Sequence, residues 1–294
     1  LCFGFGWSLI IPRVMRGVGA YALMPNAWNS QWGHNRDRAY YPWTIGGAVW
    51  SMYDYNRGCC DNICYSGLAD LFRLPKFGLL YFRTQMKEGT FTPAGPMTYE
   101  VFINSHWLEG SSDTLQVYGN VDEVKLQLNG RVIARQYPDD KPSTSEYVSR
   151  PDGGNAENID FPPFTFFNVN WERGELKAIG YKDGKAVAEH VVRTPGAVEA
   201  MDITYFESGV SASCRDLLIV YVNLKDLQGT GCFGENNREV KLEVLQGGEL
   251  RGPATIKAEA GVASFLVATT DSPMLVLKAV SGNLETMRKL KLKK

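Results

Sequence analysis

Residues 115–136 read LQVYGNVDEVKLQLNGRVIARQ, and this stretch decides the fold of the middle of the chain. Apolar and polar residues alternate in Leu115–Tyr118, Val124–Leu128 and Arg131–Gln136, which is the period-two pattern of half-buried strands. Asn129-Gly130 stands between the last two runs and is the strongest short signal for a hairpin turn. The stretch therefore predicts antiparallel β structure.

The alternation continues on both sides of a boundary at Pro195-Gly196. Upstream, three further runs and the turn Asp183-Gly184 bring the count to six or seven short strands, as in an immunoglobulin-like sandwich of about 100 residues. These runs are Phe164–Val169, Gly174–Tyr181 and Ala186–Thr194. Downstream, residues 197–294 predict a second sandwich. Its strands are Met201–Phe206, Leu217–Asp226, Glu239–Gln246, Gly261–Thr269 and Met274–Ser281, and a lysine-rich edge strand ends the chain.

The N-terminal part differs in composition from the rest of the 294 residues. Residues 1–87 hold nine Lys or Arg, four Asp and no Glu, and five of the seven Trp lie in the first 50 residues. The pattern predicts helix over Pro12–Tyr41, a buried strand over Trp43–Tyr53 and helix over Leu68–Met86. Residues 88–96 are expected to be a linker because they are rich in Gly, Pro and Thr.

Composition also excludes several classes of partner. A net charge of -1 gives no electrostatic reason to expect nucleic acid, and no apolar run reaches the ~20 residues that span a bilayer. Cys59, Cys60 and Cys64 lack the ligand spacing of a zinc site, so neither metal nor cofactor is predicted. Cys214 and Cys232 pair if their strands are neighbours; otherwise they are free thiols.

The most informative residues are GGAVWSMYD at 46–54 and GLADLFRLPKFGLLYFRTQ at 67–85. They resemble the end of the catalytic barrel in glycoside hydrolase family 2, which includes β-galactosidases and β-glucuronidases. The eighth barrel strand of that family carries G-G-x-x-W-x-x-x-D, matched here by Gly46, Gly47, Trp50 and Asp54. Residues 117–130 and 176–196 resemble the immunoglobulin-like domain that follows the barrel.

The resemblance implies a mainly β chain that corresponds to the C-terminal portion of such an enzyme. Its two immunoglobulin-like sandwiches are preceded by an α/β remnant of a TIM barrel. The expected domains are the barrel remnant (1–90), a first sandwich (91–196) and a second sandwich (197–294). A lone barrel strand cannot close a barrel, so we expect the remnant to pack on the first sandwich, to pair residues 1–11 with 44–52, or to dimerise.

The resemblance implies a truncated protein that acts on or binds β-galactosides. Family members use two Glu, because retaining hydrolysis needs a close pair of carboxyls, but residues 1–87 contain none and neither Glu can be assigned. The catalytic candidates are therefore Asp54, Asp37 and His34, with Asp61 and Asp70 as further carboxylates. The expected sugar-contacting residues are Trp50, Asp54 and Asn56, since active sites lie at the C-terminal ends of barrel strands.

Two other functions stay open. One is a non-catalytic carbohydrate-binding or structural module. The other is an esterase-like hydrolase that uses Ser51, Ser66 and His34. The expected partner is a β-linked sugar or oligosaccharide, without nucleic acid or membrane, and an exposed remnant allows a homo-oligomer. The resemblance implies a bacterial protein in the periplasm or outside the cell. His106 and His190 lie in predicted sandwich segments, where a structural role is expected.

Overall fold

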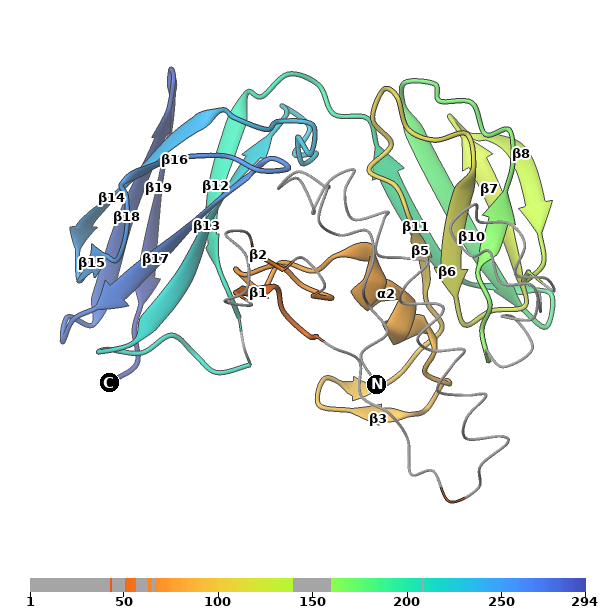
Figure 1. Ribbon diagram of the computed structural model, residues 1–294, viewed down its shortest axis with the longest axis horizontal. Coiled ribbons are helices and arrows are strands. Elements are labelled where there is room, and N and C mark those ends of the chain that lie inside the picture. The colour runs from red at the N-terminus through yellow and green to blue at the C-terminus, as the bar shows by residue number, and fades with distance from the viewer. Residues whose placement is uncertain (1–42, 44–50, 57–62, 65–66, 140–159, 208) are drawn as a thin grey trace. The chain divides into compact units, whose positions relative to one another are not determined.

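The computed structural model describes residues 43, 51–56, 63–64, 67–139, 160–207 and 209–294. Over these residues the chain is mainly β, and its named strands all pair in antiparallel fashion. The chain divides into two compact units, Leu1–Thr194 and Pro195–Lys294. Each unit holds one β-sandwich (Figure 1), as the alternating sequence pattern predicts.

The first sandwich has one sheet in the order β11-β10-β7-β8 and a second in the order β5-β6-β9. The first sheet consists of β7 (Glu123–Leu128), β8 (Arg131–Gln136), β10 (Glu175–Lys182) and β11 (Lys185–Arg193). The second consists of β5 (Val101–Ile103), β6 (Leu115–Gly119) and β9 (Phe164–Phe166). Apolar side chains from both sheets meet in one core, which includes Ile103, Val117, Leu126, Phe164 and Leu176.

The hairpin between β7 and β8 forms as the sequence predicts. Asn129 and Gly130 both have positive φ, 50° and 78°, which is the backbone of the tight turn that suits the twist of a β-hairpin. Leu128 pairs with Arg131 across this turn. Along β7, buried and half-buried residues alternate, so the period-two pattern reports directly which face meets the core.

The fully buried Trp107 is a core residue that the alternation did not indicate. It lies outside the strands with a positive φ of 51°, and its indole Nε1 donates a hydrogen bond to the Glu172 carbonyl at 3.0 Å. The short strand β5 was also missed, because three residues are too few to show a period.

The region before the sandwich contains α2 (Phe77–Thr84), the pair β1 (Tyr55–Asn56) and β2 (Ile63–Cys64), and a small hairpin. That hairpin, β3 (Phe91–Thr92) with β4 (Gly95–Pro96), lies within the predicted linker. The expected helix over Leu68–Met86 is wrong in its first nine residues, because the chain is held in a loop up to Lys76. The predicted helix over 12–41 and the strand residues 44–50 lie outside the described residues.

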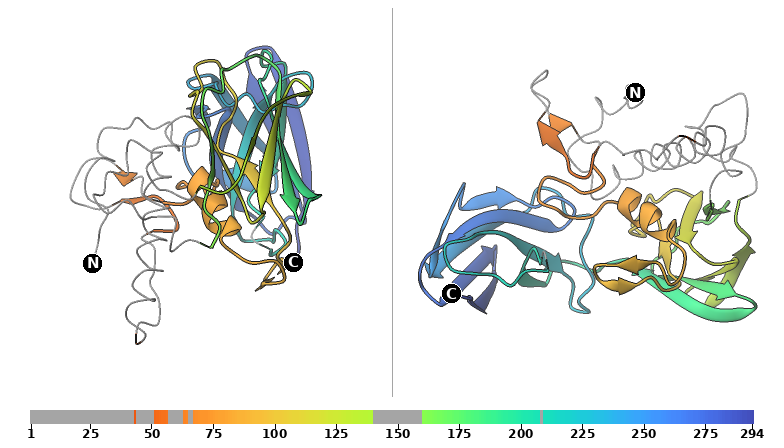
Figure 2. Two further views of the ribbon diagram at one scale, coloured as in Figure 1. Left: turned by 90° about the vertical axis from the view of Figure 1, so that its right-hand side faces the viewer. Right: turned by 90° about the horizontal axis from the view of Figure 1, so that it is seen from below.

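The second sandwich consists of two four-stranded sheets, ordered β12-β13-β17-β15 and β16-β14-β18-β19 (Figure 2). The first contains β12 (Ala200–Tyr205), β13 (Leu217–Lys225), β15 (Gly248–Leu250) and β17 (Val262–Thr269). The second contains β14 (Glu239–Gln246), β16 (Thr255–Lys257), β18 (Met274–Ser281) and β19 (Leu284–Lys291). The core lies between them and includes Val222, Phe265, Leu242 and Leu277.

The predicted strands of this unit are confirmed to within one or two residues at their ends. The lysine-rich β19 is an edge strand, where Lys side chains discourage pairing with other chains. The two three-residue strands β15 and β16 were not predicted. No helix in the described part of the chain is long and apolar enough to cross a bilayer.

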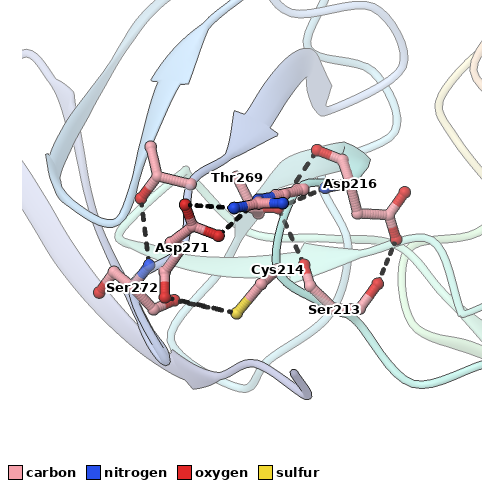
Figure 3. Close-up of polar contacts among 8 residues, drawn as sticks. Ser213, Cys214, Asp216, Thr269, Asp271 and Ser272 are labelled. Carbon is pink, nitrogen blue, oxygen red and sulfur yellow. Dashed lines mark hydrogen bonds and ion pairs between the residues drawn. The ribbon is translucent and has the colours of Figure 1, made fainter.

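Two loops of the second sandwich are fastened to each other by the contacts drawn in Figure 3. The Arg215 guanidinium forms two hydrogen bonds with the Asp271 carboxylate, and the Thr269 hydroxyl donates to the Ser213 carbonyl at 2.8 Å. Cys214 between them has a free thiol, and so does Cys232. Of the two alternatives for these cysteines, the unpaired one is therefore correct, and burial raises the pKa of Cys232 to about 11.

His190 on β11 has the structural role expected of it. Its Nδ1 accepts a hydrogen bond from the Ile103 amide at 3.1 Å, and its ring packs edge-on against Phe102 at 5.6 Å between centroids. Burial lowers the pKa of His190, because the charged imidazolium loses hydration. A protonated Nδ1 could no longer accept the Ile103 hydrogen bond.

We predict that acidification destabilises the first sandwich through His190. The unfolded chain binds a proton near pH 6.5 while the folded chain does so only at lower pH. The free energy of unfolding therefore falls as pH drops below 6.5, by at most about 1.4 kcal/mol per pH unit for one proton. Urea titrations at several pH values test this. The His190→Gln variant should show a smaller slope over that range; an unchanged slope would contradict the prediction.

Candidate functional site

Only some of the predicted site residues lie in the described part of the chain. Asp54, Asn56, Asp70 and Ser51 are described, whereas His34, Asp37, Trp50, Asp61 and Ser66 lie outside it. The site is therefore built from residues 51–56 and the loop 67–76 that pairs with them.

Asp54 lies just before β1, with only 4% of its surface exposed. Its Oδ1 accepts a hydrogen bond from the Lys76 Nζ at 2.6 Å and another from the Gly67 amide at 2.9 Å. Lys76 is itself 2% exposed. Asp54 and Lys76 therefore form a buried, hydrogen-bonded ion pair between residues 22 positions apart in the chain.

The backbone around this pair explains its geometry. The Leu68 and Ala69 amides donate to the Ser51 and Met52 carbonyls at 3.1 and 2.9 Å, and the Asp54 amide donates back to the Ala69 carbonyl at 3.0 Å. A Cβ at position 67 would lie 2.2 Å from the Asp54 nitrogen. Glycine is needed there because two backbone segments approach too closely for any side chain.

Asp70 holds the next loop rather than facing a ligand. Its Oδ1 accepts hydrogen bonds from the Phe72 and Leu74 amides at 2.8 and 2.9 Å. A carboxylate that accepts from backbone amides two and four residues ahead stabilises a turn and competes with helix formation. The predicted helix therefore starts only at Phe77, where Lys76 is the N-cap residue.

The electrostatics of Asp54 follow from its burial. Desolvation raises the pKa of this carboxyl, while the hydrogen bond and charge of Lys76 act in the opposite direction. A raised pKa is common in catalytic acids, but a general acid must also reach its substrate. The Asp54 carboxylate is enclosed with Lys76 and Gly67, so its observed contacts are structural.

The other described candidates also form contacts within the protein. The Ser51 hydroxyl donates to the Tyr53 carbonyl at 2.7 Å, and no histidine contact with it is observed among the described residues. Arg73 covers one face of the Tyr53 ring, with its guanidinium carbon 3.8 Å from the centroid. Asn56 is exposed at the end of β1, where it pairs with Ile63. The sugar-contacting role of Asn56 stays a prediction.

Lys76 belongs to the segment that resembles the family, but the sequence did not indicate its contact with Asp54. It stands in the apolar run LPKFGLL, and a lysine in such a run is rarely buried unless it is paired. That rule indicates a buried carboxylate partner, but it does not say which one, because the partner is far away in sequence.

The C-terminal end of α2 and the residue after it form side-chain hydrogen bonds with the first sandwich. Arg83 Nε donates to Glu100 Oε2 at 2.7 Å and its Nη2 donates to Oε1. Gln85 exchanges two hydrogen bonds with the Phe161 backbone, at 2.8 and 3.4 Å. In α2, the buried Tyr81 packs edge-on against Tyr118 of β6 at 5.6 Å. Of the three arrangements expected for the remnant, packing on the first sandwich is therefore observed for α2 and the residues just after it, whereas pairing of residues 1–11 with 44–52 lies outside the described residues and dimerisation stays a prediction.

Asn120 is the central polar residue of this junction and is only 1% exposed. Its Oδ1 accepts from the Glu100 amide at 2.7 Å, while its Nδ2 donates to the Met86 and Thr98 carbonyls at 3.2 and 3.0 Å. One amide side chain thus ties the end of the α2 region to two strand-flanking segments. We call Arg83, Gln85, Glu100 and Asn120 the junction cluster.

The described residues offer no group of three or more His, Cys, Asp or Glu side chains that could hold a metal ion. The cysteines at 59 and 60 lie outside the described residues.

Comparison with known proteins now gives the family context. Residues 110–188 match a family model described as a domain of unknown function, DUF4982. A β-galactosidase of Thermoanaerobacter pseudethanolicus is 31% identical over 258 residues, covering 82% of this chain and 32% of that protein. The chain is related to the C-terminal portion of proteins of glycoside hydrolase family 2.

Solved structures of glycosidases share the fold. A β-glucuronidase from glycoside hydrolase family 2 aligns with a TM-score of 0.71 and 19% identity over 96% of this chain and 28% of its own. A β-glycosidase from Bacteroides vulgatus aligns with a TM-score of 0.67 and 16% identity over 87% of this chain and 32% of its own. The chain spans about a third of the length of the curated relatives it matches.

We predict that Asp54→Ala destabilises the chain by about 3–5 kcal/mol, because it leaves Lys76 buried without its counter-charge. Asp122→Ala is a matched control. Its carboxylate also lies 2.6 Å from a lysine, Lys182, but the pair is exposed, and exposed pairs contribute about 0–1 kcal/mol. Urea unfolding of both variants measures the difference. Equal losses would show that the Asp54 pair is not the structural centre inferred here.

We predict that Asn120→Ala loosens the junction cluster, since it removes three hydrogen bonds to partly buried backbone groups, each contributing about 0.5–1.5 kcal/mol. Hydrogen exchange of the amides in α2 should accelerate more than that of the amides in β7 and β10. Thr92→Ala, which removes a side-chain hydrogen bond within the β3–β4 hairpin, serves as the control. Uniform acceleration across the unit would contradict this role for Asn120.

Proposed function

We propose that this chain serves as the C-terminal part of a family 2 glycosidase that acts on a β-linked sugar, with β-galactosides as the first candidate substrates. The 31% identity to a β-galactosidase supports this proposal. In this proposal, residues 1–90 form the end of the barrel, and residues 91–196 and 197–294 form two sandwiches. The carboxylates that break the glycosidic bond come from other residues than Asp54 and Asp70.

The observation that carries the proposal is the buried pair of Asp54 and Lys76. A carboxylate enclosed by an ammonium group 2.6 Å away cannot serve as the nucleophile or acid on an incoming sugar without leaving that partner. What it can do is fix the position of the backbone between residues 50 and 56. Trp50 and Asn56 flank Asp54 along the chain, and we propose that they contact the sugar that Asp54 itself does not reach.

A non-catalytic carbohydrate-binding role is the second candidate. It is favoured because Asp54 and Asp70 both accept hydrogen bonds from the protein itself. The described part of the remnant therefore offers no available pair of carboxyls for hydrolysis. The two candidates differ in turnover: both allow binding of a β-linked sugar or oligosaccharide, but only the first places the chain in a working glycosidase. A homo-oligomer formed through the barrel remnant is compatible with either.

A chimera tests the proposal. This chain replaces the matching C-terminal residues of the Thermoanaerobacter β-galactosidase, and hydrolysis of chromogenic β-galactoside and β-glucuronide is measured. We expect the chimera to hydrolyse the β-galactoside, and the chain alone to hydrolyse neither. A chimera that is folded, as shown by a cooperative thermal transition, but inactive on both substrates would overturn the glycosidase role.

Two variants sharpen this test. In the chimera, Asp54→Asn should lower the thermal midpoint together with kcat, because the carboxylate positions the backbone. If Asp54 were itself a catalytic acid, Asp54→Asn would instead abolish kcat and leave the thermal midpoint nearly unchanged. The Asp122→Asn variant should change neither quantity.

A further inference from the structure

The second sandwich contains a groove on its surface. It has a volume of about 430 Å³ and is lined by Val198, Glu199, Arg238, Gly282, Asn283 and Leu284. Such a volume falls within the range of small-molecule sites. All six residues belong to Pro195–Lys294, so the groove is a property of this unit alone.

The topology explains why these residues meet. β12 and β19 are the edge strands of the two facing sheets. Val198 and Glu199 come just before β12, and the turn Gly282-Asn283 precedes β19. The groove therefore opens at the edge of the sandwich, where the two sheets are not joined by hydrogen bonds.

Arg238 is held in this groove by its neighbours. Its Nε donates to the Ser281 hydroxyl at 3.1 Å, and that hydroxyl donates to the Glu239 carbonyl at 2.7 Å. A Cβ at Gly282 would lie 3.8 Å from Arg238 Nη2, so the guanidinium lies beside the turn. One edge of a planar donor group is thus fixed, and its terminal nitrogens are left for a ligand.

The polar side chains of the groove form no ion pair or hydrogen bond with one another. Within residues 195–207 and 209–294, no carboxylate lies at ion-pair distance from Arg238. Over the same residues, the side chains of Glu199 and Asn283 make no hydrogen bond. Three planar groups, a guanidinium, a carboxylate and an amide, therefore line one groove together with the apolar side chains of Val198 and Leu284.

The charges indicate the class of ligand. Arg238 and Glu199 give the groove one positive and one negative group, so an anion would meet Glu199 and a cation would meet Arg238. A neutral polyhydroxylated ligand suits both, because each hydroxyl donates one hydrogen bond and accepts others. Its C–H surface would pack on Val198 and Leu284. We infer that this groove is a binding site for a neutral saccharide of one or two units.

The inference concerns the second sandwich only and does not depend on the proposed glycosidase role. It is tested by titrating the full, ¹⁵N-labelled chain with methyl β-galactoside and, separately, with glucuronate. The neutral sugar should shift the amide signals of Glu199, Asn283 and Leu284 along one saturable curve. Glucuronate should bind more weakly, because the negative charge of Glu199 repels its carboxylate.

Variants connect the signal to the groove. Arg238→Leu should weaken binding by about 10–100-fold, since a hydrogen bond from a charged group contributes about 1.5–3 kcal/mol. Arg251→Leu is the matched control, because Arg251 follows β15 at the opposite edge of its sheet from β12. Glu199→Ala, at an exposed position, provides a second test that does not disturb the Ser281 contact.

Three outcomes would overturn the inference. One is the absence of saturable shifts with methyl β-galactoside. Another is binding that Arg238→Leu and Glu199→Ala leave unchanged, which would locate the sugar elsewhere. The third is tighter binding of glucuronate than of the neutral sugar, which would show an anion site. Thermal midpoints of all variants, measured in the same samples, separate lost binding from lost folding.

Discussion

The ion pair between Asp54 and Lys76 is the interaction on which the N-terminal part of the described structure depends. Moving a carboxylate and an ammonium out of water costs several kcal/mol for each ion, and close contact with additional hydrogen bonds must offset that cost. Both conditions are met, with Nζ 2.6 Å from Oδ1 and the Gly67 amide as a second donor. The pair joins residues 51–56 to residues 67–76, and only glycine at position 67 allows the two backbone segments to approach closely enough.

The consequences extend along the chain from Lys76 to the first sandwich. Lys76 is the N-cap residue of α2, so fixing its side chain on Asp54 also fixes where the helix begins. Eight residues later the helix ends beside the junction cluster, where Asn120 and Glu100 receive it. The described contacts thus run from the buried Asp54–Lys76 pair through Tyr81 of α2, which packs on Tyr118 of β6, to the core of the first sandwich. Such a series of contacts is better suited to hold a binding site in place than to let it change shape.

The sequence predicted those parts of the structure in which local pattern and tertiary burial coincide. β7 and β14 alternate because one face of each strand meets a core, and a period of two reports this directly. Three-residue strands such as β5 are too short to carry a period. The helix over 68–76 failed because Asp70 offers its carboxylate to backbone amides, an alternative that a helical apolar pattern does not reveal. The sequence named Asp54 as a candidate, but its partner Lys76 lies 22 residues away, and only the folded chain shows that the Asp54 carboxylate is buried against it.

The same reasoning bears on how carboxylates in this kind of chain are interpreted. Residues 1–87 have few acidic side chains, and both of those that the structure describes, Asp54 and Asp70, accept hydrogen bonds from the protein itself. In the second sandwich, by contrast, Glu199 and Arg238 lie in a groove without satisfying each other. Polar groups that already form hydrogen bonds within the protein have little left to offer a ligand. Polar groups that converge on one groove without pairing with one another can bind one. In the described residues, the groups that we propose to bind a sugar are therefore solvent-accessible side chains that do not pair with one another, rather than the acidic residues of the remnant.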